Sequence, residues 1–221
     1  MLDLSQITVV CFDGRGLDAG WVRHYENVFR YVNTFFRFKV IKFFTCSDHR
    51  FTGVEQVAIP PSSLSQYNAW CQREIREAFD TDHVMVIQWD GFPLNPELWD
   101  PAFLDCDYIG SPWPTAIRWK PTPGLQVGNG GFSIRTRKLY DVLSRYPVSQ
   151  QNEDTYISCT LRPQLEAAGI RFAPLDVAKR FGVEHMFNYT DGIRKSFGFH
   201  GGQPPWLPII KNRPRYAEYF Q

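Results

Sequence analysis

Short apolar runs alternate with segments of helical spacing in the N-terminal part of the chain. The runs ITVVCF (7–12), VIKFFT (40–45) and VEQVAI (54–59) have the length and the β-branched content of buried strands. Between the first two runs, apolar residues from Trp21 to Phe36 recur at the spacing of a helix. Because strands that alternate with helices pair side by side in parallel, this pattern predicts an α/β fold with a mostly parallel sheet.

A second helix is predicted just before a fourth apolar run. Ser63 and Gln66 have the spacing of a capping box, in which each side chain bonds to the other residue's backbone N–H. The segment from Tyr67 to Phe79 carries its charges on one face, as a surface helix does. It leads into HVMVIQWDGF (83–92), an apolar run typical of a central strand that ends abruptly in Trp-Asp-Gly.

Asp90 stands where this central strand is expected to end. In open α/β sheets, ligands bind in the crevice outside the carboxyl ends of the strands, so Asp90 is placed to face a ligand. Gly91 would let the backbone turn away beneath that ligand. The alternative is an acid that merely opens a turn before Phe92 and Pro93.

The C-terminal half alternates less regularly. From Pro93 to Pro123 the chain is turn-rich and is predicted to form surface loop or lid, with DYIGSPW (107–113) as its one strand. Three glycines then surround Asn129, and the following segments are predicted as strand FSIR (132–135), helix 138–146, a short helix 155–161 interrupted near Pro163, and strand IRFAPL (170–175). The Pro-rich tail from residue 204 is predicted to lie as a strap over the core or to touch a membrane surface.

Composition limits the possible partners. The chain has 221 residues, which suits one domain, and its 24 basic and 23 acidic residues leave too little net charge to attract nucleic acid or an anionic membrane without a local site. The five cysteines lack the spacing of a disulfide framework or a zinc site, which favours a reducing, cytoplasmic location. No stretch reaches the roughly 18 apolar residues that a transmembrane helix needs.

Four polar or glycine-rich elements follow one another, and each has a structural and a functional interpretation. Asp90 is one, and Gly128–Gly131 is another, either a tight hairpin or a place where backbone approaches a ligand closely. Glu153 and Asp154 follow Asn152, so they suit either a helix start or acid–base chemistry. His200 lies between glycines and is either a structural histidine or a metal ligand.

Together the four elements resemble the GT-A glycosyltransferases, a nucleotide-sugar-dependent family. The family's shared parts are a D-x-D metal motif, a glycine loop, an x-E-D acidic motif and a late metal-binding histidine, and the resemblance spans roughly residues 7 to 202. More narrowly, the strings QWDGFPLNPELWDPAFLDCDYIGSPWP, VGNGGFSIRTRKL and NEDTYI resemble a family of small bacterial proteins assigned to the glycosyltransferases. One position departs from the pattern, because Gln88 stands where the first aspartate of D-x-D is expected.

The resemblance implies a GT-A-like, Rossmann-type open sheet and a set of residue roles. A nucleotide-diphosphate sugar would bind at the strand ends near Asp13 and Arg15, and a divalent cation, Mn²⁺ or Mg²⁺, would lie on the diphosphate between Asp90 and His200. Asp154 would deprotonate the acceptor hydroxyl in an inverting transfer, with Glu153 as the alternative base. The remaining donor-site residues are Asn129, Gly130 and Gly131, with Trp89 or Trp113 as a stacking face.

The expected activity is therefore a hexosyl transfer to a glycan or a lipid-linked acceptor, as in bacterial polysaccharide biosynthesis, with the cytoplasm or the inner face of the membrane as its place. A nucleotide-binding half would extend to about residue 92, an acceptor and catalytic half from about 93 to 203, and a tail from 204 to 221. Two other functions stay open. One is a sugar- or nucleotide-binding module of the same fold without catalysis, and the other is a metal-dependent phosphoesterase that uses the same acids and histidine.

Overall fold

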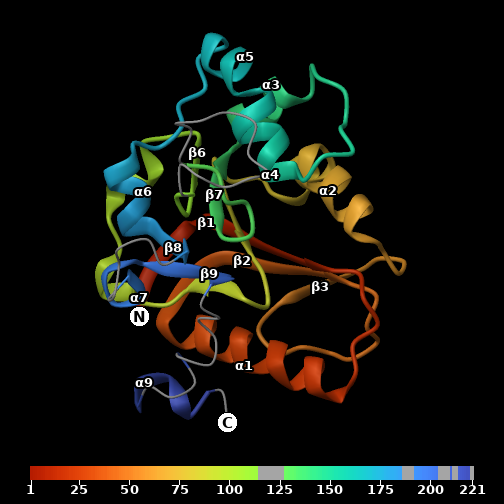
Figure 1. The fold of residues 1–221 in the computed structure, drawn as a ribbon. Coiled ribbons are helices and arrows are strands. Elements are labelled where there is room, and N and C mark those ends of the chain that lie inside the picture. The colour runs from red at the N-terminus through yellow and green to blue at the C-terminus, as the bar shows by residue number, and fades with distance from the viewer. Residues whose placement is uncertain (114–126, 186–191, 204–209, 211–213, 220–221) are drawn as a thin grey trace.

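The computed structural model describes residues 1–113, 127–185, 192–203, 210 and 214–219. A six-stranded sheet in the order β3-β2-β1-β4-β7-β6 forms its centre (Figure 1). The strands are β1 (Leu2–Asp13), β2 (Phe36–Thr45), β3 (Glu55–Ala58), β4 (His83–Ile87), β6 (Tyr108–Gly110) and β7 (Ser133–Thr136). The first four in sequence run parallel and β7 pairs antiparallel with β4, so the predicted mostly parallel sheet is confirmed.

The N-terminal elements confirm the sequence prediction closely. Helix α1 (Ala19–Phe35) starts at the N-cap Asp18, whose carboxylate accepts from two backbone N–H groups of the first turn. Helix α2 (Leu64–Gln72) has the predicted capping box at Ser63 and Gln66. It is shorter than expected, because the chain continues as a separate 3₁₀ turn, Glu74–Ala78.

Two predictions for the second half were wrong. Residues 93 to 113 are not a surface loop: Leu94, Asn95 and Phe103 are buried, and the segment forms 3₁₀ turns at Pro96–Leu98 and Pro101–Leu104 before β6. The remainder of that predicted lid, 114–126, lies outside the described residues. IRFAPL does not form a strand, since only Phe172 bridges to Tyr108 and the chain then enters helix α6 (Leu175–Phe181).

Helix α3 (Arg137–Leu143) confirms the helix predicted over 138–146, and α4 (Glu153–Thr155) begins just before the short helix predicted over 155–161. Helix α5 (Arg162–Ala167) was not predicted. Between α4 and α5 the chain makes one turn of π-helix, Tyr156–Thr160, so the predicted interruption comes slightly before Pro163. Asn152 is the N-cap of α4, yet its own side chain makes no capping bond. Asn68 of α2 accepts from the N–H of Glu153 instead, at 3.1 Å, which ties the two helices together.

A smaller second sheet stands beside the first. Its strands, in the order β5-β9-β8, are β5 (Gly91–Pro93), β9 (Gly198–Gln203) and β8 (Gly182–His185), with helix α7 (Gly192–Lys195) between β8 and β9 along the chain. The antiparallel register of β5 and β9 pairs Gly91 directly with His200. This sheet therefore brings the late histidine to the end of β4.

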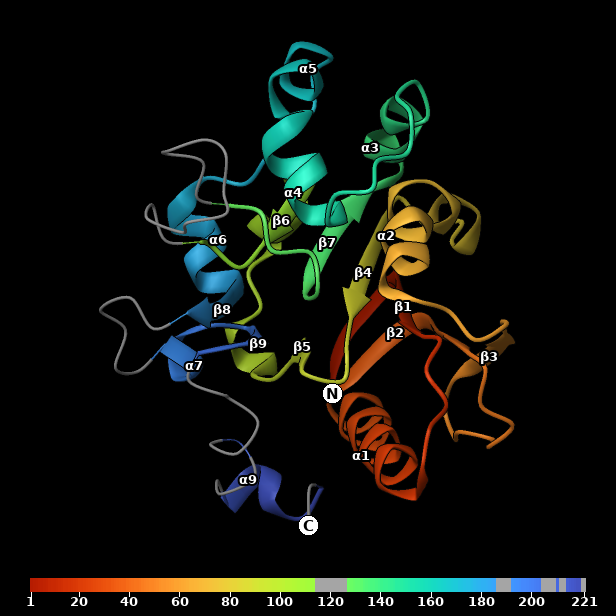
Figure 2. The same ribbon diagram turned by 45° about the vertical axis from the view of Figure 1, so that its right-hand side comes forward.

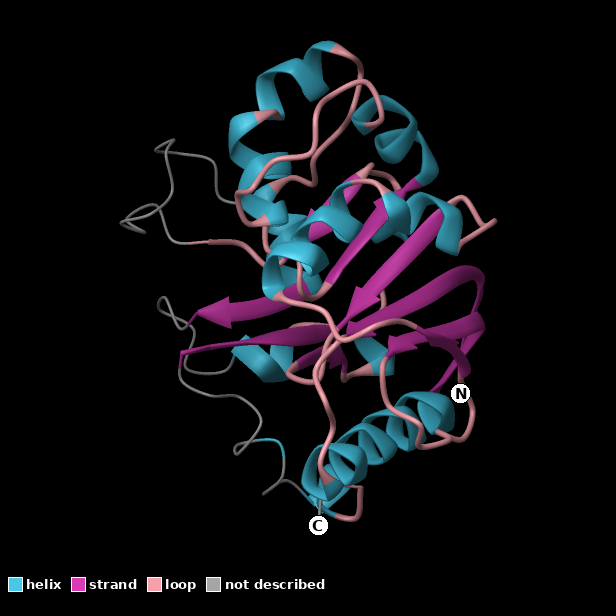
Figure 3. Ribbon diagram, turned by 90° about the vertical axis from the view of Figure 1, so that its right-hand side faces the viewer, coloured by secondary structure: helices cyan, strands magenta, loops and turns pink. Residues whose placement is uncertain are grey.

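Helices cover both faces of the central sheet (Figure 3). Val9 and Cys11 of β1 point into the core on the α1 side, whereas Val10 points into the core that includes Trp70 and Cys71 of α2. Successive residues of a strand face opposite sides, so a strand covered on both faces is apolar throughout. This explains why ITVVCF is a continuous apolar run rather than an alternating one.

The described part of the C-terminal tail packs beside α1 (Figure 2). The ring of Tyr216 in α9 (Pro214–Ala217) lies 5.3 Å from that of Tyr31, and its hydroxyl donates to Asn95 Oδ1 at 2.8 Å. Tyr219 also contacts Tyr31, with ring centroids 5.3 Å apart. These contacts favour the strap among the two predictions for the tail. None of the described helices has both the length and the apolar character of a membrane span.

Candidate functional site

A tight turn after β4 carries Asp90. Gln88 and Gly91 exchange both backbone hydrogen bonds, at 2.7 and 3.1 Å, so Trp89 and Asp90 form a two-residue hairpin loop between β4 and β5. Asp90 therefore lies in a turn and, at the same time, at the carboxyl end of a central strand. Strand β4 ends at Ile87, just before the Trp89-Asp90-Gly91 stretch at which the sequence predicts its end.

His200 lies at the centre of a polar cluster. Its Nε2 is 3.0 Å from Gln88 Oε1 and 3.8 Å from Asp90 Oδ1. Its Nδ1 is 3.0 Å from Asn129 Nδ2 and 3.2 Å from Glu184 Oε1. Three sequence-predicted residues, Asp90, Asn129 and His200, therefore lie together, and the structure adds Gln88 and Glu184.

The charges in this cluster influence one another. Burial lowers the pKa of His200, but the hydrogen bond with Glu184 and the charges of Asp90, Glu184 and Asp154 outweigh it, so the pKa is raised. Burial raises the pKa of Asp90, and the nearby charge of His200 opposes that rise. The site thus favours a positive charge beside its carboxylates.

Glycines make room for this cluster. A Cβ on Gly131 would overlap the ring of His200, and one on Gly201 would overlap the carboxylate of Asp90. A Cβ on Gly91 would also lie too close to the His200 ring. The glycines near the acid and the histidine therefore admit the protein's own side chains, which is a more specific role than the turn or ligand contact expected from the sequence.

The glycine loop also rests on a buried ion pair. Arg135 Nη2 donates to Glu153 Oε1 at 3.0 Å and to the carbonyl of Gly130 at 3.2 Å. The Arg135 side chain is fully buried, and that of Glu153 is 4% exposed. Burial lowers the pKa of Arg135, yet the charge of Glu153 outweighs it and the guanidinium stays charged. Glu153 thus joins α4 to β7 and to the glycine loop.

Asp154, the neighbouring acid, is in a different environment. It is half-buried, and its Oδ1 accepts from the backbone N–H of Thr155 at 2.6 Å and from the Thr155 hydroxyl at 3.2 Å. Its negative charge is the smallest of those that raise the pKa of His200. Of the two acids, Glu153 is the one that pairs with the buried guanidinium of Arg135.

A cavity of about 260 Å³ opens beside the Asp90 turn. The parallel register pairs Cys11 with Ile87, so Asp13 and Trp89 emerge at the same level from neighbouring strands. Three predicted donor-site residues, Asp13, Arg15 and Trp89, line the cavity. Its other lining residues are Phe12, Gly14, Ser62, Ser63, Leu64, Tyr67 and Gln88.

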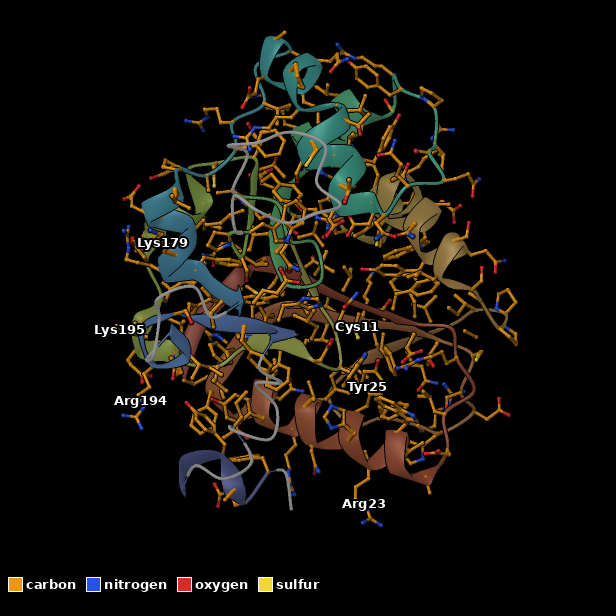
Figure 4. All side chains as sticks on the ribbon, in the orientation of Figure 1. Cys11, Arg23, Tyr25, Lys179, Arg194 and Lys195 are labelled. Atoms are coloured by element: carbon orange, nitrogen blue, oxygen red, sulfur yellow. The ribbon has the colours of Figure 1, made fainter. Side chains whose placement is uncertain are left out.

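Asp13 is fully engaged within the protein. Both carboxylate oxygens accept from Arg15, and Oδ2 also accepts from the Tyr25 hydroxyl at 2.7 Å. Burial raises the pKa of Asp13, but these hydrogen bonds lower it by a larger amount, so the carboxylate stays ionised. Tyr25 and Cys11 approach one another between the sheet and α1 (Figure 4). Asp13 therefore orients Arg15, whose guanidinium also lies 4.3 Å above the Trp21 ring.

Sequence reasoning missed several residues of the site. Arg135 could have been found from the sequence, because a charged residue inside the short apolar strand FSIR needs a buried partner. No sequence pattern around Glu184, Tyr67 or Tyr25 marks these residues as part of a site. Trp113 was wrongly expected to offer a stacking face: it is 4% exposed, and its ring fills the space where Gly128 lacks a side chain.

The side chains present can coordinate a divalent cation only if a bound ligand supplies further coordinating atoms. Asp90 Oδ1 is buried without a hydrogen-bond partner among the described residues, and it faces His200 Nε2 with Gln88 Oε1 nearby. Carboxylate, amide oxygen and imidazole are all ligands of such cations. The described residues contain no group of three or more His, Cys, Asp or Glu that suits a metal. Oxygen atoms of a bound diphosphate would have to complete the coordination.

The fold is that of the GT-A glycosyltransferases. The chain is similar to a glycosyltransferase involved in the glycosylation of the major capsid of PBCV-1, with 11% identity, 96% of this chain and 98% of that chain covered, and a TM-score of 0.53. It is also similar to the galactosyltransferase LgtC in complex with donor and acceptor sugar analogs, with 14% identity, 96% and 95% covered, and a TM-score of 0.53. At these identities the likeness concerns the fold.

The chain belongs to the family described as "Protein of unknown function (DUF5672)", whose model matches residues 58–200. The match runs from the end of β3 to His200 and so includes the Asp90 turn, the glycine loop and the two acids. No curated protein sequence matches the chain.

Proposed function

We propose that the protein is a glycosyltransferase that moves a sugar from a nucleotide-diphosphate donor to a hydroxyl of a glycan or lipid-linked acceptor. One observation carries the proposal: the cavity at the carboxyl ends of β1 and β4 adjoins the Asp90–His200 cluster. An α/β sheet of this kind binds ligands at such strand ends. The donor would place its nucleotide along Arg15 and Trp89 and its diphosphate toward Asp90.

Asp90 and His200, with the amide oxygen of Gln88, would hold Mn²⁺ or Mg²⁺ against the diphosphate. A bound cation would neutralise the charge that develops on the leaving nucleotide. Asp154 would accept the proton of the attacking acceptor hydroxyl in an inverting transfer. Its half-exposure near the cluster supports this role, whereas Glu153 serves as the counter-ion of Arg135. The glycine loop at Asn129 to Gly131 would border the donor sugar.

Ligand binding and turnover can be measured separately. A thermal-shift screen with UDP, GDP, CMP and their sugars, with and without Mn²⁺, should raise the melting temperature for one nucleotide class, because ligands that bind the native state stabilise it. The nucleotide that binds should then support transfer or slow hydrolysis of its sugar. Binding without any turnover across sugars and acceptors would indicate a non-catalytic binding module instead.

Asp90→Ala tests the position of the diphosphate. The variant should bind the nucleotide diphosphate more weakly than the wild type when Mn²⁺ is present, and the difference should shrink when EDTA replaces Mn²⁺. Asp48→Ala, which changes an acid on the loop after β2 outside the cavity, is the matched control. Unchanged affinity in Asp90→Ala would remove Asp90 from the donor site.

A further inference from the structure

The two nitrogens of His200 have conflicting hydrogen-bond neighbours. At Nδ1, Asn129 Nδ2 at 3.0 Å can only donate, whereas Glu184 Oε1 at 3.2 Å can only accept when ionised. The amide of Asn129 is held in this orientation, because its Oδ1 accepts from the N–H of Phe132 at 3.2 Å. The neutral imidazole can therefore satisfy only one of these two neighbours at a time.

Each choice has a consequence at Nε2. If Nδ1 accepts from Asn129, the proton lies on Nε2 and is donated to Gln88 Oε1 at 3.0 Å. If Nδ1 carries the proton and donates to Glu184, the lone pair of Nε2 faces Asp90 Oδ1, 3.8 Å away. Only the second tautomer leaves Nε2 able to bind a cation.

We propose that Glu184 is a positioning residue, which selects the second tautomer of His200 and so makes His200 a cation ligand. This inference rests on the cation included in the proposed function. A histidine that binds a metal usually donates its other N–H to a carboxylate, which fixes the tautomer and strengthens the ligand. Glu184 is in the right place for this, on β8 next to β9, which carries His200.

The surroundings of Glu184 and His200 favour their hydrogen bond. The side chains of Glu184 and His200 are 13% and 17% exposed, so water competes little for their hydrogen bond. Gln88 donates its Nε2 to the Tyr67 hydroxyl at 2.8 Å, which leaves Oε1 directed toward the imidazole. A neutral imidazole that donates Nδ1–H to Glu184 keeps the lone pair of Nε2 for a cation held between His200 and Asp90.

The tautomer can be observed directly by NMR. In protein labelled with ¹⁵N-histidine, the wild type with Mg²⁺ and inorganic pyrophosphate should show the His200 proton on Nδ1. A proton that stays on Nε2 under these conditions would overturn the proposal, and this measurement needs no variant. His200→Gln identifies the resonance by its absence.

Glu184→Gln removes the charged acceptor with almost no change in size. We expect it to weaken Mn²⁺ binding about 10-fold or more, as loss of such partners of a ligating histidine does, when free Mn²⁺ is followed by EPR with pyrophosphate present. Glu26→Gln is the matched control, because it removes the carboxylate of the surface pair Glu26–His49, at 2.9 Å, and should leave Mn²⁺ affinity unchanged. Equal affinity in Glu184→Gln and the wild type would overturn the proposal.

Glu184→Asp distinguishes the effect of losing the carboxylate from the effect of a folding defect. It restores a carboxylate with a shorter reach, so its Mn²⁺ affinity should fall between those of the wild type and Glu184→Gln, whereas a purely structural role would not order the three proteins in this way. None of these measurements involves sugar transfer. If His200 adopts the expected tautomer but no sugar is transferred, only the proposed function is contradicted. If sugar is transferred but His200 does not adopt that tautomer, only the role of Glu184 is contradicted.

Discussion

Arg135 and Glu153 form an ion pair across 3.0 Å in which the guanidinium is fully buried. The pair also holds the carbonyl of Gly130, so it joins β7, α4 and the glycine loop at one point. Asn129, which precedes Gly130 in that loop, contacts His200. The geometry of the polar cluster around His200 thus depends on Glu153, which lies outside that cluster.

Removing one partner of this pair should destabilise the protein strongly. Glu153→Ala leaves a buried guanidinium without its counter-charge, so we expect the free energy of unfolding to fall by about 3–5 kcal/mol in urea denaturation. Glu166→Ala, which removes the exposed pair with Arg162, should cost within about 1 kcal/mol. Similar losses in the two variants would show that the buried pair contributes no more than the surface one.

Asp154→Asn should separate binding from chemistry. The amide keeps the size of the side chain but cannot accept the acceptor's proton, so transfer should fall by about 10²–10⁴-fold. Affinity for the nucleotide diphosphate, measured by calorimetry, should stay within a few-fold of the wild type. Turnover near the wild-type rate would rule out Asp154 as the base.

Acid should weaken the contribution of Asp13 to stability. Its pKa is lower in the folded protein than in the unfolded chain, because Arg15 and Tyr25 donate to the carboxylate and outweigh the effect of burial. A group of this kind stabilises the fold above its unfolded pKa of about 3.9, and the contribution disappears as the pH falls through that value toward the folded pKa.

The test of this pH dependence uses Asp13→Asn. The difference in unfolding free energy between the wild type and Asp13→Asn should be largest near neutral pH and should shrink below about pH 4. Tyr25→Phe, which removes one of the donors, should cost about 1–2 kcal/mol at neutral pH. A difference that does not change with pH would contradict the lowered pKa.

The C-terminal strap should contribute modestly through Tyr216. Tyr216→Phe removes the donation to Asn95 Oδ1 at 2.8 Å but keeps the ring against Tyr31, so the expected cost is about 1 kcal/mol. Tyr216→Ala also removes the ring packing and should cost about 3–5 kcal/mol. Thermal or urea denaturation of both variants checks the order, and an equal effect would assign the whole contribution to the hydroxyl.

Local sequence patterns were sufficient to predict most of the secondary structure. The apolar runs at β1, β2 and β4, the helical spacing of α1 and the capping box of α2 could all be identified because each depends on residues close in sequence. The same reasoning located Asp90 at the end of a central strand. It identified the strand within 107–113, which is β6, but failed at 93–106 and at 170–175, where turn residues or an apolar run are packed by distant elements.

An acid, a glycine loop, an acid pair and a histidine could be recognised along the α/β chain before its structure was known. Their contacts could not: the register of β5 and β9 brings His200 to Gly91, β8 adds Glu184, and Arg135 engages Glu153 rather than Asp154. Periodicity reports which faces of an element are buried, whereas contacts between distant segments depend on strand register and chain path, which single-residue patterns do not encode.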